Sequence, residues 1–287
     1  MTILKGKTVV ITGASRGIGQ AIALRYAGLQ ANIVILTKDM PQQLEDITLQ
    51  IQEAGGSSLV LDVDVCDQGA ISQAVALSVE RFGGIDVLVN NTSATCFTDA
   101  LHTTPGQFDL VICTSARAAF FLAQACVPYL KNAENPHIIN ISPPLDMDSH
   151  WFENHLAFSL GKYAMSMCTL GMARAFQNLG IAVNSLWPRS TIATQTIKDH
   201  FSSEVFAGSR WPSIMADAAF ALILRKSHEC TGQFFTDEAL LRETGIVDFS
   251  HYAVDPSVPL MQALFIPKED IMTPVSQDLF LLNQPKG

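Results

Sequence analysis

The chain is short of charge, and of positive charge above all. Lys, Arg, Asp and Glu make up 16% of its 287 residues, and 18 basic residues face 27 acidic ones, for a formal net charge of -9. Proteins that bind the phosphate backbone of nucleic acids need clustered Lys and Arg. The basic residues here are scattered along the chain. We therefore expect no nucleic-acid partner.

The chain also lacks closely spaced cysteines. None of its six cysteines forms a C-x-x-C pair, although zinc sites and disulfide frameworks depend on recurring spacings of this kind. The pattern is typical of free thiols in a reducing compartment, so we expect a cytoplasmic protein with no metal site. The six are Cys66, Cys96, Cys113, Cys126, Cys168 and Cys230.

Long hydrophobic runs are missing as well. The apolar run at 118–130 is too short and too interrupted to span a bilayer. The first β-branched run begins so near the N-terminus that we expect no signal sequence. Because 48% of the residues are hydrophobic, the chain can bury a large core. We interpret residues 1–287 as a single domain.

What the chain does contain is a regular alternation of two patterns. Short β-branched runs lie at 7–12, 32–36, 58–62, 85–90, 137–141, 181–187 and 233–235, and helical patterns lie near 17–29, 41–54, 67–82, 107–131, 154–179 and 214–226. Such alternation predicts an α/β fold, a doubly wound, Rossmann-type parallel sheet of seven strands with helices on both faces. Two stretches break the pattern: 188–213, a candidate substrate lid, and 245–287, a proline-rich C-terminal extension.

A glycine-rich turn joins the first strand to the first helix. Gly13, Gly17 and Gly19 lie in the segment VVITGASRGIGQAIAL. In this context glycine lets the backbone approach a pyrophosphate, and the helix N-terminus offers unpaired N–H groups. A purely structural tight turn is the alternative. The spacing T-G-x-x-x-G-x-G resembles that of the short-chain dehydrogenase/reductase family.

The residues after the second strand bear on the type of dinucleotide. An NAD site uses a carboxylate for the ribose 2′-OH, whereas an NADP site uses cations for the 2′-phosphate. Thr37 and Lys38 suit the phosphate, Arg16 adds a second cation, and Asp39 lies one or two positions too late to select NAD. We therefore expect NADP(H) to be preferred over NAD(H).

The resemblance adds further cofactor residues. It implies that Asp64 and Val65 meet the adenine ring, and that Asn90-Asn91-Thr92-Ser93 occupies the place of the family's N-N-A-G. Asp64 also fits an Asx turn, and Asn90 fits support of the sheet. The complete expected set is Gly13, Ser15, Arg16, Gly17, Ile18, Gly19, Thr37, Lys38, Asp64, Val65, Asn91, Lys162, Pro188, Thr191 and Thr194.

The expected catalytic set is incomplete. The family uses a serine to polarise a carbonyl, a Tyr-x-x-x-Lys pair for proton transfer and ribose binding, and an asparagine that props a water chain. Ser142 matches the serine and Lys162 the lysine, but Phe158 stands at the tyrosine position and Ser115 at the asparagine position. Lys162 is the only Lys, Arg, Asp or Glu between Glu153 and Arg174, which suits a cation that holds the nicotinamide ribose.

Three residues near Phe158 are candidates for the proton donor that phenylalanine cannot supply. Tyr163 would point away from the cleft, so we interpret it as a packing residue. Ser159 is directed elsewhere, and an alcohol is a poor acid. His155, one turn before Phe158, is the better placed, although a histidine near a helix start is also typical of a cap or a core position.

Over residues 1–265 the chain is similar to the hydroxysteroid-dehydrogenase-like branch of the family, whose longer members carry a sterol-carrier domain. We expect no such domain in residues 1–287. Two hypotheses result. The first is an NADP(H)-dependent oxidoreductase acting on a ketone or secondary alcohol of an apolar substrate, with impaired or altered proton transfer. The second is a catalytically degenerate dinucleotide-binding protein with a sensor, scaffold or other non-redox role. For either, we expect a homodimer or homotetramer formed through the helices at 107–131 and 154–179.

Overall fold

The computed structural model describes residues 3–38 and 41–267, and its centre is a parallel sheet of seven strands in the order β3-β2-β1-β4-β5-β6-β7. Each strand pairs in parallel with its neighbours, so every connection crosses over the sheet. The predicted fold class is confirmed. The strands are β1 (Thr8–Thr12), β2 (Asn32–Thr37), β3 (Ser57–Asp62), β4 (Val87–Asn90), β5 (His137–Asn140), β6 (Ala182–Trp187) and β7 (Phe234–Thr236).

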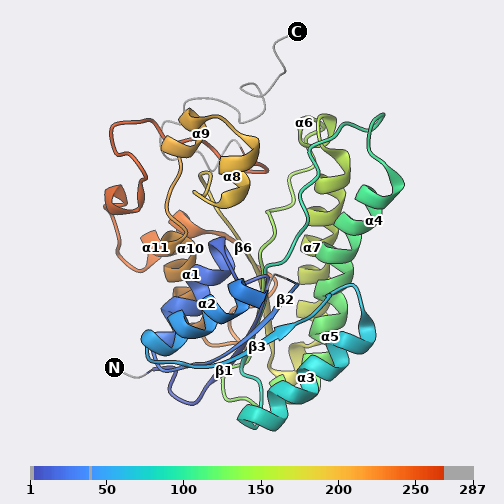
Figure 1. Ribbon diagram of the computed structural model, residues 1–287, viewed down its shortest axis with the longest axis vertical. Helices are drawn as coiled ribbons and strands as arrows, with labels where there is room; N and C mark the ends of the chain where they lie inside the picture. The colour runs from blue at the N-terminus through green and yellow to red at the C-terminus, as the bar shows by residue number, and fades with distance from the viewer. Residues whose placement is uncertain (1–2, 39–40, 268–287) are drawn as a thin grey trace.

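Helices cover both faces of this sheet (Figure 1). On one face α1 packs between α2 and α10, and α10 in turn contacts α11; on the other face α5 packs between α3 and α7. The α-helices are α1 (Gly17–Ala27), α2 (Pro41–Glu53), α3 (Gln68–Phe82), α4 (Pro105–Ile112), α5 (Ala118–Leu130), α6 (His150–Glu153), α7 (Leu156–Ala175), α8 (Gln195–His200), α9 (Ser203–Ala207), α10 (Ser213–Ile223) and α11 (Asp237–Glu243).

The helix ends follow local sequence signals. Asp67 caps α3 by accepting hydrogen bonds from the backbone N–H groups of Gly69 and Ala70, and Gly83 ends that helix in the left-handed region at φ 85°. Thr104 and Gln107 form a reciprocal capping box at the start of α4, where Pro105 takes the first turn.

The long helix predicted at 107–131 contains a wider turn. A π-helical segment, η1 (Cys113–Arg117), separates α4 from α5. Counted as one helix, Pro105–Leu130 is long and apolar enough to cross a membrane by length and composition. In this fold the same helix packs against α3 and α7. Core helices of globular proteins can have the same length and apolar composition.

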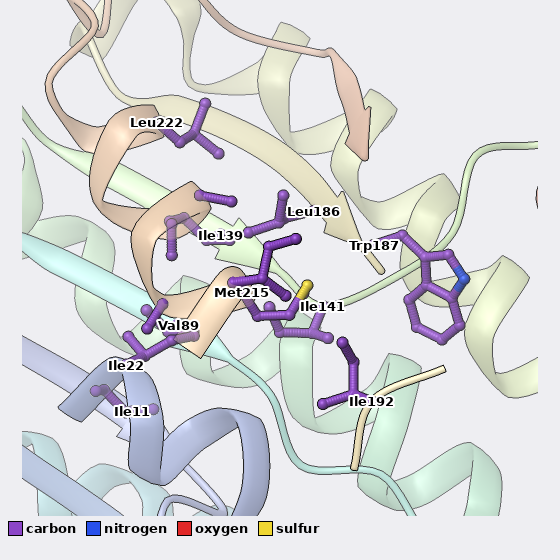
Figure 2. Packing of buried hydrophobic residues seen from close by; sticks show 14 of the residues in the cluster. Ile11, Ile22, Val89, Ile139, Ile141, Leu186, Trp187, Ile192, Met215 and Leu222 are labelled. Carbon is purple, nitrogen blue, oxygen red and sulfur yellow. The ribbon is translucent and has the colours of Figure 1, made fainter. Parts of the chain in front are cut away.

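Two apolar layers hold the sheet between its helices. Residues of β1 alternate, so Val9 and Ile11 face α1 and α10 while Val10 faces α3 and α5. Figure 2 shows the first layer, in which Ile22 and Met215 approach the strands that carry Ile11, Val89, Ile139 and Leu186. Both layers are fully buried at their centres, which fixes the strand ends that carry the site.

The candidate lid at 188–213 contains the two short helices α8 and α9, seen above α10 in Figure 1. Isolated bridges join Ile192 to Arg210 and Arg210 to Ala253, which ties the lid to the C-terminal segment. That segment is described as far as residue 267, and Trp187 donates from Nε1 to the carbonyl of Leu264 at 2.7 Å. The rest of the predicted extension, 268–287, and Asp39 lie outside the described residues.

Candidate functional site

A cavity of about 450 Å³ opens at the carboxyl ends of the central strands. In doubly wound sheets ligands bind at this edge, where the strand order reverses on either side of β1 and β4. The cavity brings together thirteen of the fifteen expected cofactor residues: Gly13, Ser15, Arg16, Gly17, Ile18, Thr37, Lys38, Asp64, Val65, Asn91, Lys162, Pro188 and Thr194.

The glycine-rich loop forms the floor of one end. Gly13 and Gly17 both have φ of 62°, a conformation that favours glycine. Asn91 holds the loop by donating from Nδ2 to the carbonyls of Thr12 and Gly13, at 2.9 and 3.0 Å. No side chain caps α1 at Arg16, and its first turn holds no acid. The first N–H groups of α1 are therefore available to an anion.

Gly19 does not line the cavity, contrary to the expectation that it contacts the cofactor. A Cβ there would lie 2.6 Å from Nδ2 of Asn91 and 2.8 Å from the carbonyl oxygen of Gly13. The absence of a side chain at Gly19 lets α1 pack closely against the glycine-rich loop. Its role follows from helix packing, one of the three roles that glycine takes in such turns.

Cations gather beyond the loop. Lys38, at the end of β2, forms a 2.7 Å ion pair with Asp64, and the two side chains are 71% and 42% exposed. The hydrogen bond from Lys38 lowers the pKa of Asp64, and the same bond raises the pKa of Lys38. Because an exposed ion pair is weak, a phosphate can compete for Lys38. Arg16 lies on the same cavity wall.

Lys162 brings a buried ammonium to the opposite end. Its side chain is 4% exposed, and Nζ donates to the carbonyl of Ile141 at 2.9 Å and lies 5.4 Å from the ring centroid of Trp187. Burial lowers the pKa of Lys162 to about 7. A buried ammonium with one protein hydrogen bond has donors to spare for ribose hydroxyls.

Phe158 lies one helical turn before Lys162 and also lines the cavity. Its ring packs 5.8 Å from that of Phe97 and 6.1 Å from that of Phe265. Phe97 in turn contacts Phe201 of the lid at 5.3 Å. Of these rings only Phe158 lines the cavity, and it is backed by Phe97 of the loop after β4 and Phe201 of the lid; we call these three rings the aromatic wall. Phe158 brings no proton donor to the cavity.

Ser142 does not reach the cavity, contrary to the expectation that it polarises a carbonyl there. Its hydroxyl is fully buried and lies 2.8 Å from Oγ of Ser185, on the neighbouring strand. The network continues from Ser185 to Thr169 at 2.8 Å and from Thr169 to Asn140 at 2.8 Å. Ser142 thus closes a chain of buried hydrogen bonds that joins β5, β6 and α7.

His155 and Tyr163 do not replace the missing acid. His155 is 1% exposed and packs near the rings of Phe158 and Phe265, and burial lowers its pKa to about 4. It is therefore neutral at pH 7, and it does not line the cavity. Tyr163 donates to the carbonyl of Asp146, and burial raises its pKa. Ser159 donates to the carbonyl of Trp151.

Ser115 lies in the π-helical segment η1, beneath α7. It is fully buried, and its Oγ lies 3.0 Å from that of Ser93, which does line the cavity. A Cβ added at Gly161 would come within 3.2 Å of the Ser115 hydroxyl. Ser115 therefore stands behind the helix that carries Lys162, one side chain away from the cavity.

The segment after β6 divides its expected residues. Pro188 and Thr194 line the cavity. Thr191 does not, because its hydroxyl pairs with that of Ser209 at 2.8 Å and its backbone N–H donates to Met261. Arg189 is turned away as well: it is 4% exposed and pairs with Glu238 at 2.8 Å.

Several lining residues were not predicted from the sequence. Thr92 lines the cavity, but its hydroxyl is buried beside Gly13 and has no hydrogen-bond partner among the described residues. The N-N-T-S segment was the available signal for Thr92 and Ser93, whereas the others come from loops without a motif. They are Val63, Thr92, Ser93, Thr95, Leu110, Thr114, Ile141, Trp187, Gln195 and Thr196. No cluster of metal-ligating side chains occurs in the described part of the chain.

A family model described as short chain dehydrogenase matches residues 7–204, more than half of the chain. The chain belongs to the short-chain dehydrogenase family. The match spans β1 through α8 and ends within α9, so it includes the glycine-rich loop, the aromatic wall and Lys162. The predicted family is confirmed.

Its relatives include hydroxysteroid dehydrogenase-like protein 2 of zebrafish (Danio rerio), which is 45% identical over 269 residues covering 92% of this chain and 64% of the relative. The human protein of that name is 44% identical with the same coverage. The chain thus spans just under two thirds of these relatives' length.

Solved structures show the same fold. A candidate dehydrogenase from Xanthomonas campestris is 42% identical, with a TM-score of 0.88 over 92% of this chain and 99% of that one. A metagenomic short-chain oxidoreductase in complex with NADP is 25% identical, with a TM-score of 0.69 over 81% and 97%.

Proposed function

We propose that this family member is an NADP(H)-dependent oxidoreductase that acts on a ketone or secondary alcohol of an apolar substrate, with altered proton transfer. The observation that carries the proposal is the single cavity in which the glycine-rich loop, Lys38 and Lys162 meet. NADP(H) would supply the hydride to such a site. The chain itself supplies the binding groups and the environment of the reacting carbon.

The cations at one end support NADP(H) over NAD(H). Arg16 and Lys38 line the cavity next to Thr37, where a 2′-phosphate would be bound. The relative solved with NADP agrees with this preference. Lys38→Glu is expected to weaken NADPH binding by about tenfold, since it replaces attraction by repulsion, and to leave NADH binding nearly unchanged.

Lys162 supports the placement of the nicotinamide end. Its ammonium is fixed by the carbonyl of Ile141 and can donate further hydrogen bonds into the cavity. This ammonium fits a polar ligand in a cavity whose other wall is aromatic.

The aromatic wall supports an apolar substrate. Phe97 contacts Phe158, Phe201 and His200, at 5.8, 5.3 and 5.8 Å. Phe158 is the ring of this group that lines the cavity, and the others pack behind it and connect it to the lid. Such a wall gains free energy by burying hydrocarbon and excludes water from the reacting carbon.

In its groups for proton transfer this site differs from the catalytic set that the family resemblance implies. Phe158 has no hydroxyl and Ser142 is committed to Ser185. With a pKa near 7, Lys162 is the titratable side chain of this aromatic end that can exchange a proton at working pH. We assign the proton to Lys162 or to water bound by it.

The test combines binding with turnover. Full-length protein is titrated with NADPH and NADH, and hydride transfer is then followed on a panel of apolar ketones. We expect NADPH to bind more tightly and to be consumed slowly with at least one ketone. Tight NADPH binding without turnover on any ketone would exclude the enzyme and leave the second hypothesis.

That second hypothesis is a dinucleotide-binding protein with a sensor or scaffold role. The buried hydroxyl of Ser142 and the ring of Phe158 favour it, because both remove groups that would act on a carbonyl. It predicts that NADPH raises the melting temperature as much as it would in an enzyme, while no carbonyl compound is reduced.

Self-association through α4, α5 and α7 forms part of the proposal, as does a cytoplasmic location. Large apolar side chains are exposed on these helices, among them Leu110 at 52% and Met167 at 55%. A hollow of about 510 Å³ lies between α5 and α7, lined mostly by apolar residues such as Phe120 and Met172. Burying this face in a homodimer or homotetramer would remove it from water.

A further inference from the structure

Another hollow, of about 510 Å³, lies along α1 and adjoins the cofactor cavity at Arg16 and Gly17. Its walls are one face of α1, the lid helices α8 and α9, and the start of α10, which Figure 1 shows close together. Its volume falls within the range of small-ligand sites. The lining residues are Arg16, Gly17, Gln20, Ala21, Leu24, Ala193, Thr194, Gln195, Lys198, Phe206, Trp211, Pro212 and Ser213.

The charge of this groove is opposite to that of the protein. The chain carries a formal net charge of -9, yet the described lining includes Arg16 and Lys198 and neither Asp nor Glu. Within the described ranges no salt bridge joins either cation to a carboxylate. The nearest acid on α8, Asp199, accepts a hydrogen bond from Gln195 at 2.7 Å. The groove therefore favours an anion.

The same groove carries an exposed aromatic surface. Trp211 is 43% exposed, although Trp is usually well buried. Its ring meets that of Phe206 edge to face at 6.3 Å, and Nζ of Lys198 lies 5.0 Å from the Phe206 centroid. Phe206 thus lies between the cation and the indole, and an exposed indole in the same groove as a cation can stack on a flat ring while the cation binds a charged group.

We propose that the groove between α1 and the lid binds a phosphorylated nucleotide, with its base on Trp211 and its phosphates on Lys198 and Arg16. Phosphate accounts for the two cations and the lack of acid in the described lining. A flat ring accounts for the exposed indole, which phosphate alone does not require. The ligand is a second one, separate from the dinucleotide of the cofactor cavity.

The two sites touch. Arg16, Gly17, Thr194 and Gln195 line both the groove and the cofactor cavity. Two anions that share Arg16 repel each other, so we expect each to weaken the other severalfold, and equally in both directions. Lys198 and Trp211 line the groove and not the cofactor cavity, so they can be changed separately.

The experiment is calorimetric titration of the full-length protein, first saturated with NADPH, with ADP, adenosine and inorganic pyrophosphate. We expect saturable ADP binding at least tenfold tighter than that of either fragment. Absence of ADP binding to the NADPH-saturated protein would overturn the proposal, because ADP would then share the cofactor cavity or not bind. Pyrophosphate binding as tightly as ADP would overturn the nucleotide assignment.

Substitutions in the groove test whether ADP binds there. Lys198→Glu and Trp211→Ala are each expected to weaken ADP at least tenfold with NADPH affinity unchanged, and Trp211→Phe to restore most of the stacking. Lys131→Glu, at the exposed end of α5, is the charge-matched control. ADP affinity that ignores both groove variants places the ligand elsewhere and refutes the proposal. The result does not depend on carbonyl reduction, so it stands apart from the proposed oxidoreductase function.

Discussion

The two ends of the cofactor cavity are built from different materials. At the phosphate end, where we propose that the dinucleotide phosphates bind, the available groups are backbone N–H groups of α1, glycines with positive φ and exposed cations such as Lys38. At the aromatic end they are buried side chains, Phe158 and Lys162, held by α7 and the lid. The first end depends on chain geometry and the second on the chemistry of single side chains.

The two ends of the cavity therefore tolerate different kinds of amino-acid substitution. A loop that binds through its backbone tolerates many side chains but few changes of conformation. A wall of side chains tolerates substitution but changes its chemistry with each one. Under the proposed function, the lack of a hydroxyl at Phe158 leaves dinucleotide binding intact while it alters proton transfer.

The lid beside the aromatic end is held by a cluster of buried ion pairs around Glu238. Glu238 is 1% exposed and pairs with Arg189 at 2.8 Å, Arg210 at 2.6 Å and Arg242 at 2.7 Å. Burial disfavours its charge, but the hydrogen bond from Arg242 and the nearby guanidinium charges hold the pKa of Glu238 below its usual range. Asp237 accepts from the Arg189 backbone. These ions fasten both ends of the lid to α11.

The largest effect should come from breaking this anchor. Glu238→Gln keeps the shape and leaves the buried guanidinium groups of Arg189 and Arg210 without their main counter-ion. We expect a loss of about 3–5 kcal/mol of unfolding free energy, measured by urea denaturation. Glu229→Gln, which breaks the exposed pair with Lys226, should leave the urea midpoint unchanged. An unaltered midpoint in Glu238→Gln would show that the lid is held by apolar packing.

The next effect tests the phosphate end. Gly13→Val forces a β-branched side chain to φ 62° and places its Cβ 2.6 Å from Oγ1 of Thr92. NADPH affinity should fall by about 100-fold or more, equivalent to about 2.7 kcal/mol. Fluorescence titration measures it, and Gly84→Ala, in open space, is the control. NADPH binding as in the parent protein would mean that the loop does not carry the phosphates.

A smaller effect tests the aromatic end. The double change Phe158→Tyr with Ser115→Asn restores the two residues that the family resemblance expects. Because a positioned general acid is worth about 100-fold or more, while Ser142 stays buried, we expect ketone reduction to rise by about tenfold. The measurement is kcat with NADPH in excess; Phe152→Tyr, on α6, is the matched hydroxyl control. An unchanged kcat would favour the non-redox hypothesis.

The sequence predicted the first end better than the second. All seven strands lie within two residues of their predicted bounds, because β-branched runs reveal buried strands. The glycine-rich turn was readable because its conformation requires glycine. The helices α6, α8, α9 and α11 were missed, since four to seven residues are too few to show a helical period.

Two residues expected to line the cavity, Ser142 and Thr191, do not line it, and the physical reason is the same for both. Ser142 is paired with Ser185, 43 residues away, and Thr191 with Ser209 and Met261. Which way each hydroxyl turns depends on partners brought close by the sheet and the lid, and local pattern does not record them. Lys162 was recognised because an isolated cation in an apolar helix is unusual whatever surrounds it.

The smallest effect concerns the free energy stored at Lys162. Its pKa is lowered from 10.5 to about 7 in the folded chain, so between these values the unfolded chain binds more protons and stability rises with pH. Lys162→Met removes the cost of burying this charge. The variant also loses the hydrogen bond to the carbonyl of Ile141, which offsets most of that gain. Without cofactor it should be more stable by a net ~1 kcal/mol at pH 7, with a gain that shrinks as pH rises toward 10.

Urea denaturation at several pH values measures that gain, and NADPH titration gives its counterpart. If Lys162 holds the ribose, the stabilised variant must bind NADPH more weakly, because the same ammonium that costs stability supplies the hydrogen bonds. A variant that gained stability and kept its NADPH affinity would contradict this role. The aromatic end would then be a packing surface, and the comparison between the two ends would hold for the phosphate end alone.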